Sequence, residues 1–193
     1  IRPMLDGEHY TQISSDGKRL VKYSFKTGKE VATIFDVETA RDCTIKHFDD
    51  YIMSPNESLI LIQTDTKPIY RHSFTANYYI FNVKNNKMEP LSTGGPQQVP
   101  LFSPDGNQIA FVRNNNIYLV KLLFNNSESQ ITTDGKYNEV LNGIPDWVYE
   151  EEFGFNRAFD FSADSKMIAY IRFDESKVPM YSFPLYKGKS PSL

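Results

Sequence analysis

Short apolar stretches separated by polar turns recur along the chain. Four segments share an apolar stretch, a serine, a turn that contains Asp or Asn, and a second apolar stretch. They read HYTQISSDGKRLVKYSF, DYIMSPNESLILIQT, VPLFSPDGNQIAFVR and AFDFSADSKMIAYIR, with their serines at Ser14, Ser54, Ser103 and Ser162. Repeats about 40 to 60 residues apart that contain several strands each are typical of the blades of a β-propeller.

The third repeat shows the pattern within one blade. Residues 108–113, QIAFVR, are almost all apolar, as expected of a strand that neighbouring blades cover on both sides. Residues 116–120 predict the next strand and residues 129–132 a polar outer strand. The turns SSDG and SPDG suit tight hairpins, because Gly and Asp tolerate a positive φ.

These patterns predict an all-β fold, a partial β-propeller of about four blades. The predicted blades are residues 8–40, 49–92, 97–132 and 157–186.

The segment before the last repeat departs from this pattern, which explains the long spacing there. Asp146 follows a proline and predicts a helix N-cap, and Gly154 predicts the helix end. We therefore expect a short helical insertion at residues 144–154, with the helix itself running from Trp147 to Phe153. It carries the acidic run DWVYEEEF.

A helical wheel at about 100° per residue separates the side chains of this helix. Tyr149 and Phe153 share one face, which we expect to pack on the propeller. Glu151 points nearly opposite, and Glu150 and Glu152 flank it. Two adjacent carboxylates can share a ligand, so Glu151 belongs to either pair, and the wheel leaves its companion open.

Several partners would suit such a carboxylate pair. A primary ammonium ion has three donors for two or three acceptors. A nearby arginine, such as Arg157 or Arg172, would also fit, as would a hard metal ion, although no Asp-rich loop with alternating ligands accompanies the run. The simplest alternative is a solvated acidic helix, which describes most glutamate runs.

Composition and charge indicate the class of domain and give no sign of some partners. The 193 residues are 40% hydrophobic and 14% aromatic, which suits a globular β-rich domain. The net charge is −3 and the charges are interspersed, so no basic stripe indicates a nucleic-acid partner. Cys43 is the only cysteine, so no internal disulfide can form. The chain starts and stops abruptly, as expected of a fragment.

Three segments resemble one family of peptidases. Residues 142–152, NGIPDWVYEEE, resemble the double-glutamate motif of the dipeptidyl peptidase IV family, which are prolyl oligopeptidase-type serine peptidases. Residues 70–78, YRHSFTANY, resemble its arginine segment. Residues 174–181, DESKVPMY, resemble the strands that follow its glutamate helix. The likeness runs in order through most of the chain, and the seven positions of DWVYEEE make it specific.

The resemblance implies an N-terminal β-propeller joined to an α/β-hydrolase domain. Together these would remove dipeptides from peptide N-termini, mostly after Pro or Ala. By motif position, Glu151 and Glu152 would hold the α-ammonium of the substrate, and Arg71 would contact a nearby peptide carbonyl. Two other readings of Arg71 remain, a surface arginine or the structural partner of a carboxylate. The resemblance implies no metal and no cofactor.

The rest of the expected machinery is missing from this chain. No G-x-S-x-G motif occurs, so we expect no catalytic residue, no hydrolase domain and no activity from the chain alone. The expected partners are peptides with a free N-terminus and the hydrolase domain of the same protein. We expect self-association of the fragment through uncovered blade faces, and a homodimer of the longer protein.

The low cysteine content favours an exported bacterial protein, of the periplasm or the cell envelope. An alternative function is a non-catalytic β-propeller binding module, which would share the SPDG turns. DWVYEEE together with YRHSFTA favours the peptidase.

Overall fold

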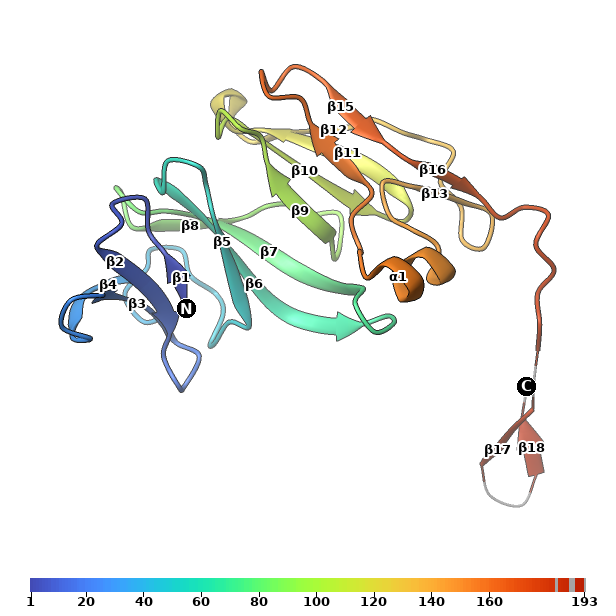
Figure 1. Ribbon diagram of the computed structural model, residues 1–193, viewed down its shortest axis with the longest axis horizontal. Coiled ribbons are helices and arrows are strands. Elements are labelled where there is room, and N and C mark those ends of the chain that lie inside the picture. The colour runs from blue at the N-terminus through green and yellow to red at the C-terminus, as the bar shows by residue number, and fades with distance from the viewer. Residues whose placement is uncertain (183, 188–189, 193) are drawn as a thin grey trace.

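Three four-stranded antiparallel sheets follow one another in the computed structural model, which describes residues 1–182, 184–187 and 190–192 (Figure 1). In each sheet the strands lie side by side in chain order. The first sheet contains β1 (Arg2–Pro3), β2 (His9–Ile13), β3 (Arg19–Ser24) and β4 (Glu30–Asp36). The second contains β5 (Asp50–Met53), β6 (Leu59–Pro68), β7 (Phe74–Asn82) and β8 (Lys87–Pro90). The third contains β9 (Gln98–Phe102), β10 (Gln108–Arg113), β11 (Asn116–Lys121) and β12 (Ser127–Gln130).

The fourth repeat forms two shorter strand pairs. β14 (Phe159–Phe161) pairs with β15 (Ile168–Tyr170). β13 (Val140–Asn142) comes from the segment before the repeat and pairs with β16 (Arg172–Asp174). The inserted segment therefore supplies a strand as well as the helix α1 (Trp147–Phe153).

The remaining elements lie outside these sheets. They are the 3₁₀ turn η1 (Leu122–Phe124) and the hairpin of β17 (Leu185–Lys187) with β18 (Ser190–Ser192). The predicted last blade, 157–186, includes residue 183, which lies outside the described residues.

The serine of every repeat makes the same two hydrogen bonds. Its Oγ donates to the side-chain oxygen of the residue two positions later and accepts the backbone N–H of the residue five positions later. The donated bonds are Ser14–Asp16 at 2.6 Å, Ser54–Asn56 at 2.9 Å, Ser103–Asp105 at 2.6 Å and Ser162–Asp164 at 2.6 Å. The accepted bonds come from Arg19, Leu59, Gln108 and Met167 at 2.9 to 3.0 Å. The serine thus closes the hairpin between the first two strands of each repeat.

The third residue after each of these serines has a positive φ. The values are 69° at Gly17, 58° at Glu57, 73° at Gly106 and 61° at Ser165. Glycine adopts this conformation without strain, whereas Glu and Ser adopt it at some cost. The SSDG and SPDG turns therefore follow the prediction, and the two repeats without glycine keep the same turn geometry.

The hydrophobic cores lie between successive sheets. One core joins the first two sheets and includes Phe35 and Phe81, whose rings contact edge to face with centroids 4.8 Å apart. β10 contributes to the next two cores by alternation. Ile109 and Phe111 belong to the core with the second sheet, and Ala110 and Val112 to the core with the last repeat.

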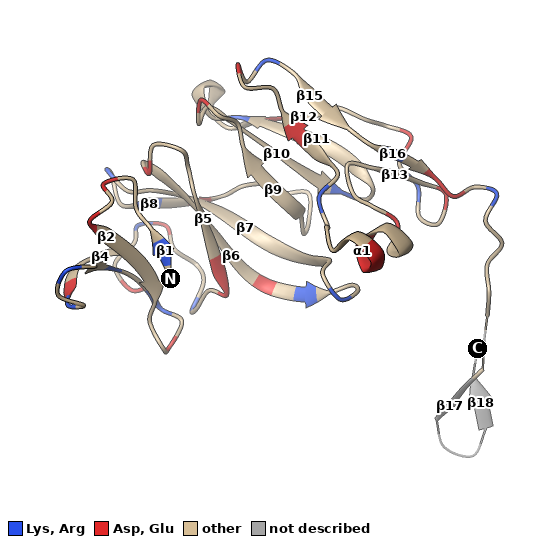
Figure 2. Ribbon diagram, viewed as in Figure 1, with Lys and Arg blue, Asp and Glu red and all other residues tan. Residues whose placement is uncertain are grey.

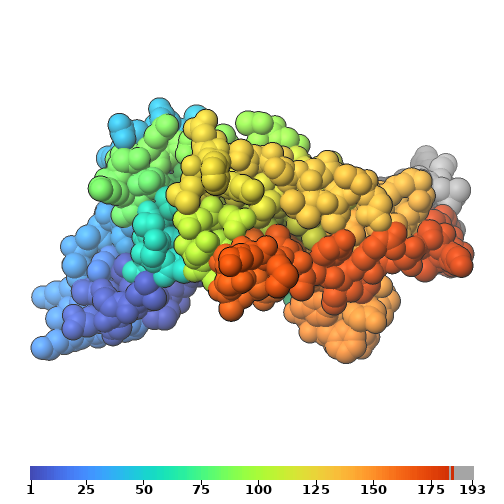
Figure 3. All heavy atoms as spheres, turned by 90° about the horizontal axis from the view of Figure 1, so that it is seen from above, coloured from blue at the N-terminus to red at the C-terminus, as the bar shows by residue number. Residues whose placement is uncertain are grey.

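All four of these β10 side chains are fully buried, as predicted for a strand covered on both faces. Figure 3 shows the first sheet at one end of the molecule, the second sheet next to it, and the last repeat alongside the third sheet. The fold is therefore a partial β-propeller with one short helix. Within the described ranges, no helix has the length and apolar character needed to cross a bilayer.

Candidate functional site

The helix α1 has the two caps that the sequence predicts. The Asp146 side chain accepts a hydrogen bond from the backbone N–H of Tyr149 at 2.9 Å. At the other end, Gly154 has a φ of 70° and its N–H donates to the carbonyl of Glu150 at 2.9 Å. These caps satisfy backbone groups that a helix of only seven residues leaves unpaired at its ends.

The aromatic face of α1 packs on the propeller only in part, through Tyr149, and it is not the face that the helix buries. Tyr149 is 44% exposed and Phe153 is 68% exposed. Their rings contact each other, with centroids 5.4 Å apart, and Tyr149 also contacts Phe173 of β16 at 5.1 Å. The buried residue of the helix is Glu150 instead, at 2% exposure.

Glu150 is buried because the turn between β6 and β7 supplies its hydrogen bonds. Glu150 Oε1 accepts the backbone N–H groups of His72 and Ser73, both at 2.8 Å. Asn156, just after the helix, donates from Nδ2 to the carbonyl of His72 at 2.8 Å. A buried carboxylate is tolerated when such donors replace water. These bonds fix the turn that carries Arg71 against α1.

Arg71 and Glu151 meet across this junction. Arg71 Nε lies 3.2 Å from Glu151 Oε2, with the two side chains 74% and 21% exposed. Figure 2 shows the acidic helix α1 beside the loop between β6 and β7. The reading of Arg71 as the partner of one of the glutamates therefore agrees with the structure.

Glu152 is exposed, and within the described ranges it forms no ion pair. The structure thus turns Glu150 inward and leaves Glu151 and Glu152 as the outer carboxylates. The two other candidate arginines lie elsewhere. Arg172 pairs with Asp134 and Asp174, and Arg157 makes no ion pair in the part of the chain that the structure describes. The binding roles assigned to Glu151, Glu152 and Arg71 stay predictions.

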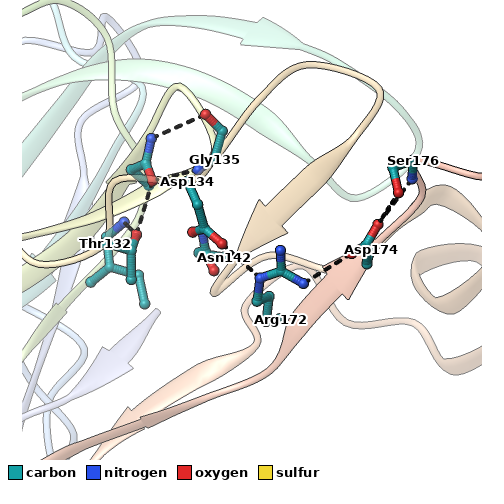
Figure 4. Close-up of polar contacts among 9 residues, drawn as sticks. Thr132, Asp134, Gly135, Asn142, Arg172, Asp174 and Ser176 are labelled. Carbon is teal, nitrogen blue, oxygen red and sulfur yellow. Dashed lines mark hydrogen bonds and ion pairs between the residues drawn. The ribbon is translucent and has the colours of Figure 1, made fainter.

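A polar network holds the segment that leads into α1 (Figure 4). Asp134 accepts from Asn142 Nδ2 at 2.8 Å and from Arg172 Nε at 2.7 Å. Arg172 also donates to Asp174 at 3.2 Å. The hydrogen bond from Arg172, followed by that from Asn142, lowers the pKa of Asp134. Through Asp134 the network joins β13 to β16, and β13 ends just before α1 begins. The network therefore helps to fix the position of α1.

The sequence alone did not predict that Glu150 and Asn156 hold the β6–β7 turn against α1 through hydrogen bonds. The helical wheel places Glu150 on a different face from Glu152, but only the tertiary structure shows that its carboxylate accepts the backbone N–H groups of His72 and Ser73. The available signal was the third glutamate itself, which a two-carboxylate site does not need. No cluster of His, Cys, Asp or Glu among the described residues could hold a metal ion.

Comparisons with known proteins agree with this architecture. Residues 54–192 match the family described as "Dipeptidyl peptidase IV (DPP IV) N-terminal region". Dipeptidyl peptidase 4 of Trichophyton equinum is 37% identical over 187 residues, which cover 95% of this chain and 23% of that protein. Probable dipeptidyl-aminopeptidase B of Talaromyces stipitatus is 41% identical over 147 residues, covering 72% of this chain and 16% of that protein.

A solved structure gives the same result. The crystal structure of Porphyromonas gingivalis dipeptidyl peptidase 4 superposes with a TM-score of 0.92 and 46% sequence identity, and covers 99% of this chain and 27% of that one. The chain therefore spans about a quarter of the length of the two dipeptidyl peptidase 4 proteins. It belongs to the dipeptidyl peptidase IV family, as a fragment of the N-terminal region.

Proposed function

We propose that this chain is the part of a serine-type dipeptidyl peptidase that recognises the free N-terminus of a peptide. The enzyme would release X-Pro and X-Ala dipeptides. The observation that supports this role is the junction of Arg71 and Glu151, whose charged groups lie 3.2 Å apart although Arg71 comes from the second repeat and Glu151 from the inserted segment. The carboxylates can accept hydrogen bonds from an α-ammonium group, and the guanidinium beside them can donate to the peptide carbonyl that follows it.

The recognition chemistry follows from the donors and acceptors. The α-ammonium donates three hydrogen bonds, and Glu151 and Glu152 supply the acceptors. Arg71 donates to the carbonyl that follows the amine. In the absence of substrate, Glu151 keeps the exposed guanidinium close to the site. Binding therefore finds the arginine already near its working position, which lowers the ordering cost.

Such a site measures length as well as charge. If the carboxylates lie at a fixed distance from the nucleophile, only a peptide that begins two residues upstream places its scissile carbonyl correctly. Binding energy from the amine then positions the reacting bond. An internal peptide segment has no ammonium to offer, so it gains nothing from the carboxylates.

The chemical step belongs to residues outside these 193. No G-x-S-x-G motif occurs in the sequence, so the nucleophile would come from a hydrolase domain of the longer protein. We expect the purified chain to hydrolyse neither Gly-Pro nor Ala-Pro chromogenic substrates. Turnover by the pure chain would contradict this assignment of domains.

Kinetics of the full-length protein test the proposal. Glu151→Ala and Glu152→Ala should each lower kcat/KM by at least about 30-fold, because loss of one partner of a hydrogen-bonded charge pair costs about 2–5 kcal/mol. Arg71→Ala should also lower kcat/KM. Acetylating the substrate N-terminus should remove the difference between wild type and the two glutamate variants. If the variants cleave a free-amine substrate like wild type, the proposal is wrong.

A further inference from the structure

An acidic cavity lies on the inner side of α1, away from the outer carboxylates. Its volume is about 200 Å³, and it lies between α1, the turn after β6 and the segment that precedes β13. For comparison, an apolar cavity of about 150 Å³ accommodates benzene. The cavity can therefore hold a molecule of the size of one aromatic side chain. We refer to it as the α1 cavity.

Three carboxyl groups line the α1 cavity, from Asp146, Glu150 and Glu175. No Lys, Arg or His is among the described residues that line it. Burial raises the pKa of Glu175, and the nearby charge of Asp146 raises it further. Negative charge therefore accumulates here without a basic side chain to balance it. A bound cation would supply that balance.

Unused hydrogen-bonding atoms point to a ligand independently of the charge. Glu150 is 2% exposed, and only its Oε1 is used, by the N–H groups of His72 and Ser73. Its Oε2 has no hydrogen-bond partner in the described part of the chain. Ser73 also lines the cavity, and its buried Oγ has no partner among the described residues. Buried polar atoms normally find partners, so the unpartnered Ser73 Oγ beside this cavity indicates an absent molecule, and the free Glu150 Oε2 can accept a hydrogen bond from it.

The walls select an organic cation over a metal ion. Tyr70, Tyr137 and Trp147 line the cavity, and aromatic faces attract cations. Within the described ranges, no set of acidic, His or Cys side chains is arranged to hold a metal ion. The carboxyl groups are thus spread around the cavity, and a ligand with a charged end and a flat apolar body would meet both carboxylates and rings.

We propose that the α1 cavity binds a small organic ammonium ion with an aromatic or similarly flat apolar body. The ammonium donates to Glu150 Oε2, and the apolar body lies among the three aromatic side chains. This site is separate from the Glu151, Glu152 and Arg71 site and does not depend on its role. A ligand here would contact Glu150, which also fixes the turn that carries Arg71.

Fluorescence of Trp147 gives a direct test, because it is the only tryptophan of the chain and lines the cavity. The probe is benzylamine at neutral pH, and benzyl alcohol and benzoate are controls of similar size without positive charge. We expect benzylamine to change the emission saturably, with the two controls at least about tenfold weaker. Equal binding by benzyl alcohol, or no saturable change with benzylamine, would overturn the proposal.

Matched glutamine variants locate the bound amine. Glu150→Gln and Glu175→Gln should each weaken benzylamine binding about fivefold or more, whereas Glu152→Gln on the same helix should leave it unchanged. If Glu150→Gln does not fold, Glu175→Gln alone decides, because the Glu175 side chain makes no hydrogen bond in the described part of the chain. Loss of binding in Glu152→Gln but not in Glu175→Gln would place the amine on the outer carboxylates. That result would overturn this inference and leave the proposed function intact.

Discussion

Glu150 Oε1 accepts the backbone N–H of Ser73 at 2.8 Å, across a separation of 77 positions in the sequence. The bond joins the helix of the inserted segment to the β6–β7 turn of the second sheet. Arg71 lies in that turn, so Glu150 determines where the arginine is presented although it does not contact the guanidinium. The first of the three glutamates therefore positions this turn, and the second lies in an ion pair with Arg71.

Replacing Glu150 should uncouple the turn from the helix. Glu150→Ala leaves the N–H groups of His72 and Ser73 unpaired, and we expect the free energy of unfolding to fall by about 2–4 kcal/mol. Glu150→Gln keeps an acceptor oxygen and should lose less than about 1.5 kcal/mol. Urea denaturation measures both, with Glu152→Ala as the exposed control. Equal stability of Glu150→Ala and Glu152→Ala would contradict this role.

The same variants separate positioning from direct binding. In the full-length protein, Glu150→Ala should lower kcat/KM through a displaced Arg71, and Glu150→Gln should restore most of the loss. A substrate-contacting carboxylate would not be rescued by glutamine, because the charge is what the ammonium binds. If Glu150→Gln is as impaired as Glu150→Ala, the charge of Glu150 acts directly.

The repeat serines should matter most where the hairpin is buried. Ser103 is fully buried and bonds both Asp105 and the N–H of Gln108, so Ser103→Ala should destabilise the chain by about 1–2 kcal/mol. Ser162 makes the same bonds in the last repeat but is half-buried, so Ser162→Ala should cost less. Thermal denaturation of the two variants compares them. A larger loss for Ser162→Ala would show that burial does not set the cost.

The network around Arg172 should make stability depend on acidic pH. Hydrogen bonds to Ser176 and then Arg172 lower the pKa of Asp174 from 3.8 to about 2, and Arg172 is the main cause of the lowered pKa of Asp134. A carboxyl group with a lowered folded-state pKa stabilises the fold above its ordinary pKa, and this contribution is lost as the pH falls toward the folded value. We therefore expect the melting temperature to fall from pH 3.8 toward pH 2.

Arg172→Met should flatten that part of the pH profile, because the two aspartates lose a shared partner. Arg41→Met is the matched control, since Arg41 donates to the backbone carbonyl of Asn85 and not to a carboxylate. Melting curves between pH 2 and pH 6 decide the comparison. Identical melting profiles for wild type and Arg172→Met would show that this network does not cause the pH dependence of stability.

Exposed apolar side chains at both ends of the row of sheets should drive self-association of the chain. Phe25 and Val31 are 52% and 53% exposed in and beside the first sheet, and Met167 and Ile171 are 67% and 51% exposed at the last repeat. Covering such surface contributes about 25 cal/mol per Å². Light scattering coupled to size exclusion should show mass rising with concentration, and Met167→Lys with Ile171→Lys should reduce the effect. A monomer at high micromolar concentration would contradict the prediction.

The sequence alone determined the repeating architecture. The serine turns recur at blade-like intervals, and an almost fully apolar strand such as β10 can only lie between two covered faces. It also determined the helix α1, because Asp146 and Gly154 supply local caps whose geometry needs no distant residue. These features depend on neighbours in the chain, so a linear pattern is enough to predict them.

Only the tertiary structure decided which glutamate is buried. The wheel treats α1 as an isolated cylinder, and the strongest apolar signal on it is the pair Tyr149 and Phe153. The face that meets the propeller is instead the one where His72 and Ser73 present two backbone donors. The carboxylate of Glu150 is buried because two backbone donors from a distant turn replace its water, whereas the aromatic rings stay largely exposed. These donors come from residues far away in the sequence, so no local pattern could predict them.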